Sequence, residues 1–236
     1  MFDRSAHVYD LLYGGMKGYA AEAEDVAALV LARNPAARTL LDVACGTGEH
    51  LSSLAADFDE VAGVDVEPGM LAVARTKLPG IRLETGDMRT FDLGRTFDAV
   101  VCLFSSVGYM ASTDELDAAI GRMAAHLAPG GVVIVDGWIR PDAWHPGVNV
   151  HALSATGEGV AAARVARTRR DGARTTLDFR YEVATAEGFE AFDETHVMTL
   201  FTDGAYRAAF DRAGLAPDAV EGPMGPDRDR YVAVRD

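Results

Sequence analysis

Short, mostly apolar runs alternate with helix-like segments along the first half of the chain, and this alternation is what most constrains the fold. The runs are Thr39–Ala44, Val61–Val64, Ile81–Glu84, Phe97–Leu103 and Val132–Val135. Helix-start signals stand between them, such as the cap and acidic residues of Thr113-Asp114-Glu115. Buried strands joined by helices form right-handed βαβ units. We therefore expect an α/β, Rossmann-like, doubly wound and mostly parallel sheet.

The pattern changes after the fifth expected strand. Residues 1–38 read as helical, but between Trp138 and Phe201 no strong helix pattern occurs. Apolar and polar side chains alternate over 175–183, which is typical of an antiparallel strand with one polar face. Segments 161–167 and 195–201 are its expected neighbours. We predict a single domain, 1–236, in which 138–201 forms an antiparallel β insertion that caps the substrate side. A helix at 202–213 and final strands near 217–220 and 231–234 complete it.

The segment Leu40–Gly48 is the strongest local signal for a ligand. A strand runs into Gly46 and Gly48, whose lack of a Cβ lets the backbone approach a bound molecule. Asp65 ends the next strand, where its carboxylate can accept hydrogen bonds from both hydroxyls of an adenosine ribose. Further along, Asp87 can accept from an adenine amino group, and Met88 can cover the ring.

The chemistry of this loop favours S-adenosylmethionine over a nicotinamide dinucleotide. The dinucleotide fingerprint needs a third glycine, and Leu51 stands in its place. Asp42 precedes the loop, and a negative charge there disfavours phosphate but suits a cation. S-adenosylmethionine carries an ammonium and a sulfonium group and no phosphate.

Four motifs together resemble the aminosugar N-methyltransferases of antibiotic biosynthesis, which methylate dTDP-linked amino sugars as in the desosamine and mycaminose pathways. The motifs are Asp42–Gly48, Gly86–Arg89, Phe104–Tyr109 and Leu127–Gly131. The resemblance implies that the cofactor is lined by Tyr19, Ala44, Asp65, Asp87, Met88 and Leu103. It implies that Tyr13, Tyr109 and Trp138 face the sugar.

Two segments depart from the pattern of that family. Asp136-Gly137-Trp138-Ile139 stands where the family has an acidic-Pro-Trp-Trp run, and 225–230 replaces a Ser-Gly-Arg-Gly stretch. Both segments are expected to border the substrate, with Arg228 as a contact. The departures leave the exact sugar, and even the sugar class, open.

An arginine cluster lies within the expected insertion, although the chain is acidic overall. It consists of Arg164, Arg167, Arg169, Arg170 and Arg174. Arginine presents forked donors that suit a diphosphate, and Arg167 and Arg169 share one strand face. We expect these two to bind the substrate's phosphates. The alternative is a hairpin whose solvated face happens to be basic.

The expected reaction is displacement of a methyl group from a sulfonium onto a neutral amine, which needs alignment more than a strong base. We expect Tyr13 and Tyr109 to be the catalytic side chains, with proton removal by Tyr109 or water and no metal. His145, His151 and His196 are weaker candidate bases. The alternatives are O- or C-methylation of another metabolite, which would need such a base, a nicotinamide dehydrogenase, and a non-catalytic cofactor-binding protein.

Charge and cysteine content limit the partners. The formal net charge is -14, from 22 basic and 36 acidic side chains, which disfavours nucleic acid and anionic membranes as partners. No apolar run is long enough for a membrane span. Cys45 and Cys102 share no metal-ligand spacing and suit the reducing cytoplasm. The number of subunits stays open, with a homodimer as one option.

Overall fold

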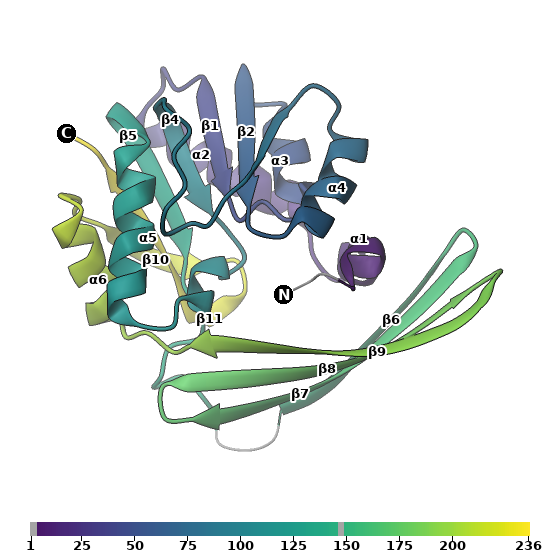
Figure 1. Ribbon diagram of the computed structural model, residues 1–236. Coiled ribbons are helices and arrows are strands. Elements are labelled where there is room, and N and C mark those ends of the chain that lie inside the picture. Colours follow the sequence, from purple (N-terminus) through teal and green to yellow (C-terminus); the bar gives the residue numbers. More distant parts are fainter. Residues whose placement is uncertain (1–3, 146–148) are drawn as a thin grey trace.

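The computed structural model describes residues 4–145 and 149–236 and contains two β-sheets. The larger sheet has seven strands in the order β10-β11-β5-β4-β1-β2-β3. The smaller sheet has four strands in the order β6-β7-β8-β9. In Figure 1 the smaller sheet lies beneath the larger one and extends well beyond it.

The larger sheet confirms the predicted α/β fold. Its five parallel strands are β1 (Thr39–Val43), β2 (Glu60–Asp65), β3 (Arg82–Thr85), β4 (Phe97–Cys102) and β5 (Leu127–Asp136). The connecting helices are α3 (Glu49–Leu54), α4 (Pro68–Lys77) and α5 (Thr113–Ala125), with a 3-10 turn η1 at Ser106–Tyr109. β10 (Asp218–Gly222) and β11 (Gly225–Val234) close one edge, and β11 runs antiparallel to β5.

Alternate side chains of the central strands feed two separate cores. In β1, Leu41 and Val43 face the side covered by α5 and α6 (Asp203–Arg212), where Ile120 and Phe210 are fully buried. Leu40 faces the opposite side, which is covered by α2 (Tyr19–Arg33), α3 and α4. Because both faces are covered, the strands read as continuous apolar runs, and this is why the sequence predicted them well.

The insertion contains four antiparallel strands joined by successive hairpins. They are β6 (Asn149–Gly157), β7 (Val160–Asp171), β8 (Arg174–Thr185) and β9 (Gly188–Thr199). The last three match the expected segments, but β6 was missed. It is an edge strand whose side chains are mostly exposed, so it lacks the apolar alternation on which the prediction depended.

The N-terminal helical region is divided into two helices that lie in different places. α1 (Ala6–Gly14) packs between the two sheets and contacts β6, β7 and α4 (Figure 1). Its Val8, Leu12 and Tyr13 share a core with Phe179 and Tyr181 of β8. Ser5 ties the start of α1 to Glu194 of β9 through its backbone N (3.0 Å) and its Oγ (2.8 Å). Within residues 4–145 and 149–236, none of the helices combines the length and apolar character needed to cross a lipid bilayer.

Candidate active site

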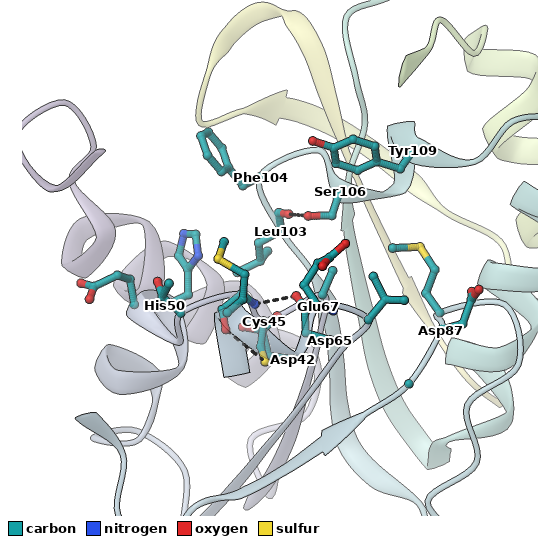
Figure 2. A pocket seen from close by; sticks show the side chains of 18 of the residues that line it. Asp42, Cys45, His50, Asp65, Glu67, Asp87, Leu103, Phe104, Ser106 and Tyr109 are labelled. Carbon is teal, nitrogen blue, oxygen red and sulfur yellow. Dashed lines mark hydrogen bonds between the residues drawn. The ribbon is translucent and has the colours of Figure 1, made fainter. Parts of the chain in front are cut away.

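A cavity of about 220 Å³ opens at the carboxyl ends of β1, β2 and β4, the edge where open parallel sheets hold their ligands. Eight of the residues predicted to hold the cofactor line it, namely Tyr19, Asp42, Ala44, Gly46, Asp65, Asp87, Met88 and Leu103. Tyr109 lines it as well. Figure 2 shows Phe104 and Tyr109 on the opposite side of the cavity from Asp42 and Asp65.

The loop after β1 takes a left-handed backbone conformation at three positions. Ala44, Gly46 and Gly48 have φ values of 62°, 56° and 79°. Gly46 lines the cavity, whereas Gly48, which we expected to contact the cofactor, is the N-cap of α3 and is not among the lining residues. A Cβ at Gly48 would lie 2.6 Å from Leu78 Cδ1. That glycine is therefore required by packing and backbone geometry.

Two buried carboxyl groups form the floor of the cavity. Asp42 is only 2% exposed, and burial, with Asp65 as the next cause, raises its pKa to about 8. Asp65 accepts hydrogen bonds from Gly46 N and Glu67 N, both at 2.8 Å, and burial raises its pKa too. Asp65 thus holds the glycine loop in place, and its carboxylate oxygens still have lone pairs for a ligand.

The carboxylate of Asp87 is fixed by an arginine at the far end of the cavity. Arg89 Nε donates to Asp87 Oδ1 at 2.9 Å, and Arg89 Nη1 donates to Glu115 at 2.7 Å. The bond from Arg89 holds the pKa of Asp87 below its usual value, so Asp87 stays an anionic acceptor. Its contact to an adenine amino group stays a prediction.

The charges that line the cavity suit a cation. Its carboxyl groups come from Glu49, Asp65, Glu67 and Asp87, and from Asp42 once it loses its proton, against one arginine, Arg89. A dinucleotide pyrophosphate would be repelled there, whereas a sulfonium and an ammonium group fit. Within residues 4–145 and 149–236, no group of three or more His, Cys, Asp and Glu side chains could hold a metal ion.

The segment after β4 forms the cavity wall opposite Asp42 and Asp65, and its backbone has an unusual conformation. Phe104 and Ser105 have φ values of 55° and 61° without being glycine, a conformation that costs on the order of 1 kcal/mol or more per residue. Phe104 N donates to Asp136 Oδ2 at 3.0 Å, and Ser105 Oγ donates to Gly137 O at 2.7 Å. Arg230 of β11 donates to Asp136 Oδ1 at 2.6 Å, and both of these charged groups are buried. The ends of β5 and β11 therefore position this wall.

Tyr109 connects the cavity to the second sheet. Its hydroxyl lies 2.9 Å from His196 Nδ1 of β9, and burial raises the pKa of Tyr109 well above its usual value. His196 Nε2 lies 3.5 Å from Glu194, the carboxylate that Ser5 also binds. The sequence placed Tyr109 at the site but gave little weight to His196, because a single histidine in a strand has no distinctive pattern.

Tyr13 and Trp138 lie behind the cavity and do not line it. Tyr13 stacks on Tyr9, with ring centroids 4.4 Å apart, and Tyr9 is the residue that reaches the cavity. The Tyr13 hydroxyl accepts a hydrogen bond from Arg164, and Trp138 Nε1 donates to Thr175 Oγ1 at 3.1 Å. Both residues form part of the region between the cavity and the inner face of the second sheet.

The arginines are distributed differently from our expectation. Arg167 and Arg169 lie on the exposed outer face of β7, and Arg169 pairs with Asp178 at 2.7 Å. Arg164 points to the inner face and is buried, because side chains alternate along a strand. The guanidinium of Arg228 lies over the ring of Trp138, 4.2 Å from its centroid, and burial lowers its pKa to about 10. Arg228 is therefore packed against Trp138, whereas Arg167 and Arg169 lie on the exposed face of β7, and the phosphate contacts of all three stay predictions.

A buried charged cluster beside the cavity was not predicted. Lys17 Nζ lies 2.9 Å from Glu22 and 3.2 Å from Nε2 of His50, which lines the cavity. Burial lowers the pKa of both Lys17 and His50. Lys17 also sits over the ring of Phe104, 3.6 Å from its centroid. Nothing in the sequence marks this lysine as buried, since lysine is almost always exposed.

Comparison with known proteins places the chain in a family. The model of the methyltransferase domain family matches residues 40–131. A dTDP-3-amino-3,4,6-trideoxy-alpha-D-glucopyranose N,N-dimethyltransferase of Streptomyces venezuelae is 46% identical, over 97% of both chains. A dTDP-3-amino-3,6-dideoxy-alpha-D-glucopyranose N,N-dimethyltransferase of Streptomyces fradiae is 45% identical, over 94% of this chain and 86% of its own. The chain belongs to the amino-sugar N-methyltransferase family.

Solved structures agree with this membership. The crystal structure of DesVI from Streptomyces venezuelae superposes with a TM-score of 0.92 at 46% identity, covering 98% of both chains. A SAM-bound amino pentose methyltransferase of calicheamicin biosynthesis, from Micromonospora echinaspora, has a TM-score of 0.83 at 44% identity and 94% coverage of both chains. The fold class and the family resemblance predicted from the sequence are confirmed, and the protein is an S-adenosylmethionine-dependent methyltransferase.

Proposed function

We propose that this amino-sugar N-methyltransferase transfers methyl groups from S-adenosylmethionine to the amino nitrogen of a dTDP-linked amino sugar in the biosynthesis of an antibiotic. One observation carries the proposal. A cavity with an acidic lining at the carboxyl edge of the parallel sheet has Tyr109 in its wall, on the side of the antiparallel sheet. The relatives at 45–46% identity, which act on dTDP-linked amino sugars by name, support it.

The lining residues fit S-adenosylmethionine group by group. Asp65 would accept from the ribose hydroxyls, Asp87 from the adenine amino group, and Asp42 would lie near positive charge. When bound, the cofactor supplies an electrophilic methyl group on a sulfonium. The chain's own contribution is alignment and exclusion of water, which can account for much of the acceleration when the acceptor is a neutral amine.

The sugar nucleotide would lie between Tyr109 and the inner face of the antiparallel sheet, which acts as its cap. Trp138 and Arg228 stand together on that side, so a stacked base or a phosphate could bind there. Buried Arg164 is held by Tyr13 and by His151 Nε2 at 3.1 Å. We assign the diphosphate to Arg228 in preference to Arg167 and Arg169, because those two face solvent.

Mass spectrometry with two matched acceptors tests the function. The purified protein is incubated with S-adenosylmethionine and dTDP-3-amino-3,4,6-trideoxy-alpha-D-glucopyranose, and we expect products with one and then two added methyl groups. The matched sugar with a hydroxyl in place of the amine should stay unmodified. Methylation of the hydroxyl compound alone would favour O-methylation, and tight calorimetric binding of NAD with no response to S-adenosylhomocysteine would contradict the proposal altogether.

The protein is further proposed to act in the cytoplasm and to form a homodimer. Two buried free thiols, Cys45 and Cys102, suit a reducing compartment. The outer face of the second sheet presents exposed apolar side chains at Val150, Val165 and Val197. A second copy of the chain could cover these residues.

A further inference from the structure

We propose that Tyr109, His196 and Glu194 form a proton-transfer chain that removes the proton from the newly methylated nitrogen. This inference rests on the proposed function. His196 and Glu194 are assigned here a role in the reaction, although neither lines the cofactor cavity. The proton-transfer chain begins at a tyrosine in the cavity wall and ends at a carboxylate of β9 that is bound by Ser5, at the start of α1.

The chemistry of two successive methylations requires such an acceptor. A neutral amine that accepts a methyl group becomes an ammonium ion, which has no lone pair and cannot accept a second. One proton must leave before the second transfer, and in a closed site it must leave through a protein group or a trapped water. The relatives named above are N,N-dimethyltransferases, so they complete two rounds.

The geometry supplies a hydrogen bond for the first step and a nearby carboxylate for the second. Tyr109 Oη lies 2.9 Å from His196 Nδ1, within the range of a strong hydrogen bond. His196 Nε2 lies 3.5 Å from a Glu194 oxygen. The His196 side chain is fully buried, and it packs against the Phe179 ring at 5.0 Å between centroids. Two bonds from Ser5, to the two different carboxylate oxygens, fix the orientation of Glu194.

These contacts define the direction of transfer. The Glu194 carboxylate near Nε2 favours the imidazole tautomer with its hydrogen on Nε2, so Nδ1 is the acceptor and Tyr109 Oη donates to it. The ammonium N–H bond breaks and its proton binds Tyr109 Oη while the tyrosine proton passes to Nδ1. The amine regains its lone pair, His196 becomes an imidazolium, and the Glu194 carboxylate balances its charge. His196 later loses the proton to water when the site opens.

Tyr109 alone is a poor acceptor. Burial is the main cause of its raised pKa and the acidic groups Glu194 and Asp65 add to it, so a free phenolate would be costly. A simultaneous transfer to His196 avoids the phenolate.

The other charged or titratable groups nearby cannot take over the role of His196 as proton acceptor from Tyr109. The Phe179 ring contacts His196 and is also covered by the guanidinium of Arg164, from β7. The positive charge of Arg164 would destabilise a protonated His196, and the negative charge of Glu194 offsets this effect. His50 is bound to Lys17 and Glu22, and His151 to Arg164, so neither meets Tyr109.

The test compares His196→Gln, Glu194→Gln and Tyr109→Phe with the wild type, using the dTDP-amino sugar probe. Glutamine can still accept a bond from Tyr109 but cannot carry the proton. We expect His196→Gln to lower kcat for the second methylation by about tenfold or more while KM changes little, because acid–base groups contribute roughly 10²–10⁴-fold. Monomethylated product should accumulate, higher pH should restore part of the rate, and Glu194→Gln should show a smaller loss.

A matched control and a readout independent of turnover complete the design. His126 is also buried, far from the cavity, with Nδ1 2.7 Å from Arg122 O, so His126→Gln should keep the wild-type product ratio. Nitrogen-15 spectra of the unliganded protein should show His196 protonated on Nε2, with this preference weakened in Tyr109→Phe. Calorimetric cofactor binding confirms that each variant is folded.

The outcomes separate the two proposals. A wild type that is inert on the amine probe contradicts the proposed function itself. A wild type that is active, with a His196→Gln variant that still dimethylates at the wild-type ratio, overturns the proton-transfer chain alone. Nitrogen-15 spectra that show the His196 proton on Nδ1 overturn the proton-transfer chain, even if the variants lose methylation activity as expected.

Discussion

Asp42 shows how one buried side chain links cofactor binding to protonation. Its pKa is raised to about 8 mainly by burial, whereas in the unfolded chain a carboxyl group titrates near 4. Between those two pH values the folded state holds a proton that the unfolded state has lost. The contribution of Asp42 to stability therefore falls as pH rises from about 4 to about 8.

We predict that Asp42→Asn stabilises the unliganded protein relative to the wild type, and increasingly so as pH rises from 6 to 8. The same variant should bind S-adenosylmethionine more weakly, because the amide cannot become an anion beside the cationic ligand. Thermal unfolding across pH gives the first quantity. Calorimetry in buffers of different ionisation enthalpy gives the affinity for S-adenosylmethionine and the number of protons released. The wild type should release protons when it binds the cofactor near pH 7. Equal proton release by both proteins would show that Asp42 does not titrate with the ligand.

Asp65 is predicted to contribute to affinity more than to folding. Asp65→Ala removes the acceptor for the ribose hydroxyls and should weaken cofactor binding by about 1.5–3 kcal/mol for each charged hydrogen bond lost. The loop bonds to Gly46 N and Glu67 N are lost too, so Asp65→Asn, which keeps one carbonyl acceptor, is the matched variant. Calorimetry should rank the wild type above Asn and Asn above Ala. An unchanged dissociation constant in folded Asp65→Ala would make the carboxylate purely structural.

At the scale of elements, the ends of β4, β5 and β11 act together through one buried ion pair. Asp136 binds both Arg230 and the backbone of the left-handed segment that begins at Phe104. We predict that Asp136→Asn lowers the free energy of unfolding by about 3–5 kcal/mol, because it leaves the Arg230 charge buried and uncompensated. Urea unfolding measures this loss.

The double variant Asp136→Asn with Arg230→Met is the control, since it removes the charge as well. It should be more stable than Asp136→Asn alone and still less active than wild type, because Phe104 N has lost its anionic acceptor. If the double variant is as unstable as the sum of both single changes, the ion pair is not the cause of the loss.

The elements that the sequence predicted well are those that are buried on both faces. The runs around Leu41, Val64 and Val100 needed no alternation to be recognised, because the parallel strands of this fold are covered by helices. The sequence did not predict β6, because its mostly exposed residues lack the alternation of apolar and polar side chains. Arg167 and Arg169 were predicted to share a face, which is correct, but the sequence could not say which face meets solvent. Strand periodicity fixes relative orientation only, and the inward side is set by the packing of α1.

The site residues divide in the same way. Asp65 and Asp87 follow strands directly, so their place at the carboxyl edge could be predicted from the order of elements alone. Lys17 and His196 reach the site from a helix-flanking turn and from a distant strand, and only the three-dimensional packing brings them there.

For the whole molecule, the outer face of the second sheet is the surface we expect to pair two copies. In Figure 1 none of the described helices covers the lower side of β6 to β9. Val165 stands near the middle of this side, and Phe189, 91% exposed, stands near a hairpin tip. We predict that Val165→Asp weakens a dimer, measured by light scattering after size exclusion at several concentrations.

Met224→Asp is the matched control for this prediction, because Met224 is exposed on a turn of the other sheet. It should leave the mass unchanged. A wild-type protein that stays monomeric at high concentration would remove the dimer from consideration and leave these valines as ordinary exposed residues.

The contact between Ser5 and Glu194 has a consequence for translation. The two residues are 189 positions apart, so at about 5–20 residues per second the ribosome needs roughly ten to forty seconds to deliver the partner of α1. Until then the second sheet, on which α1 packs, lacks β9, and the contact that ties the start of α1 to this strand cannot form. Nascent chains stalled before β9 should therefore be cleaved by protease within α1, and released chains should resist. A nascent enzyme would then be unable to close its cofactor site until its synthesis is almost complete.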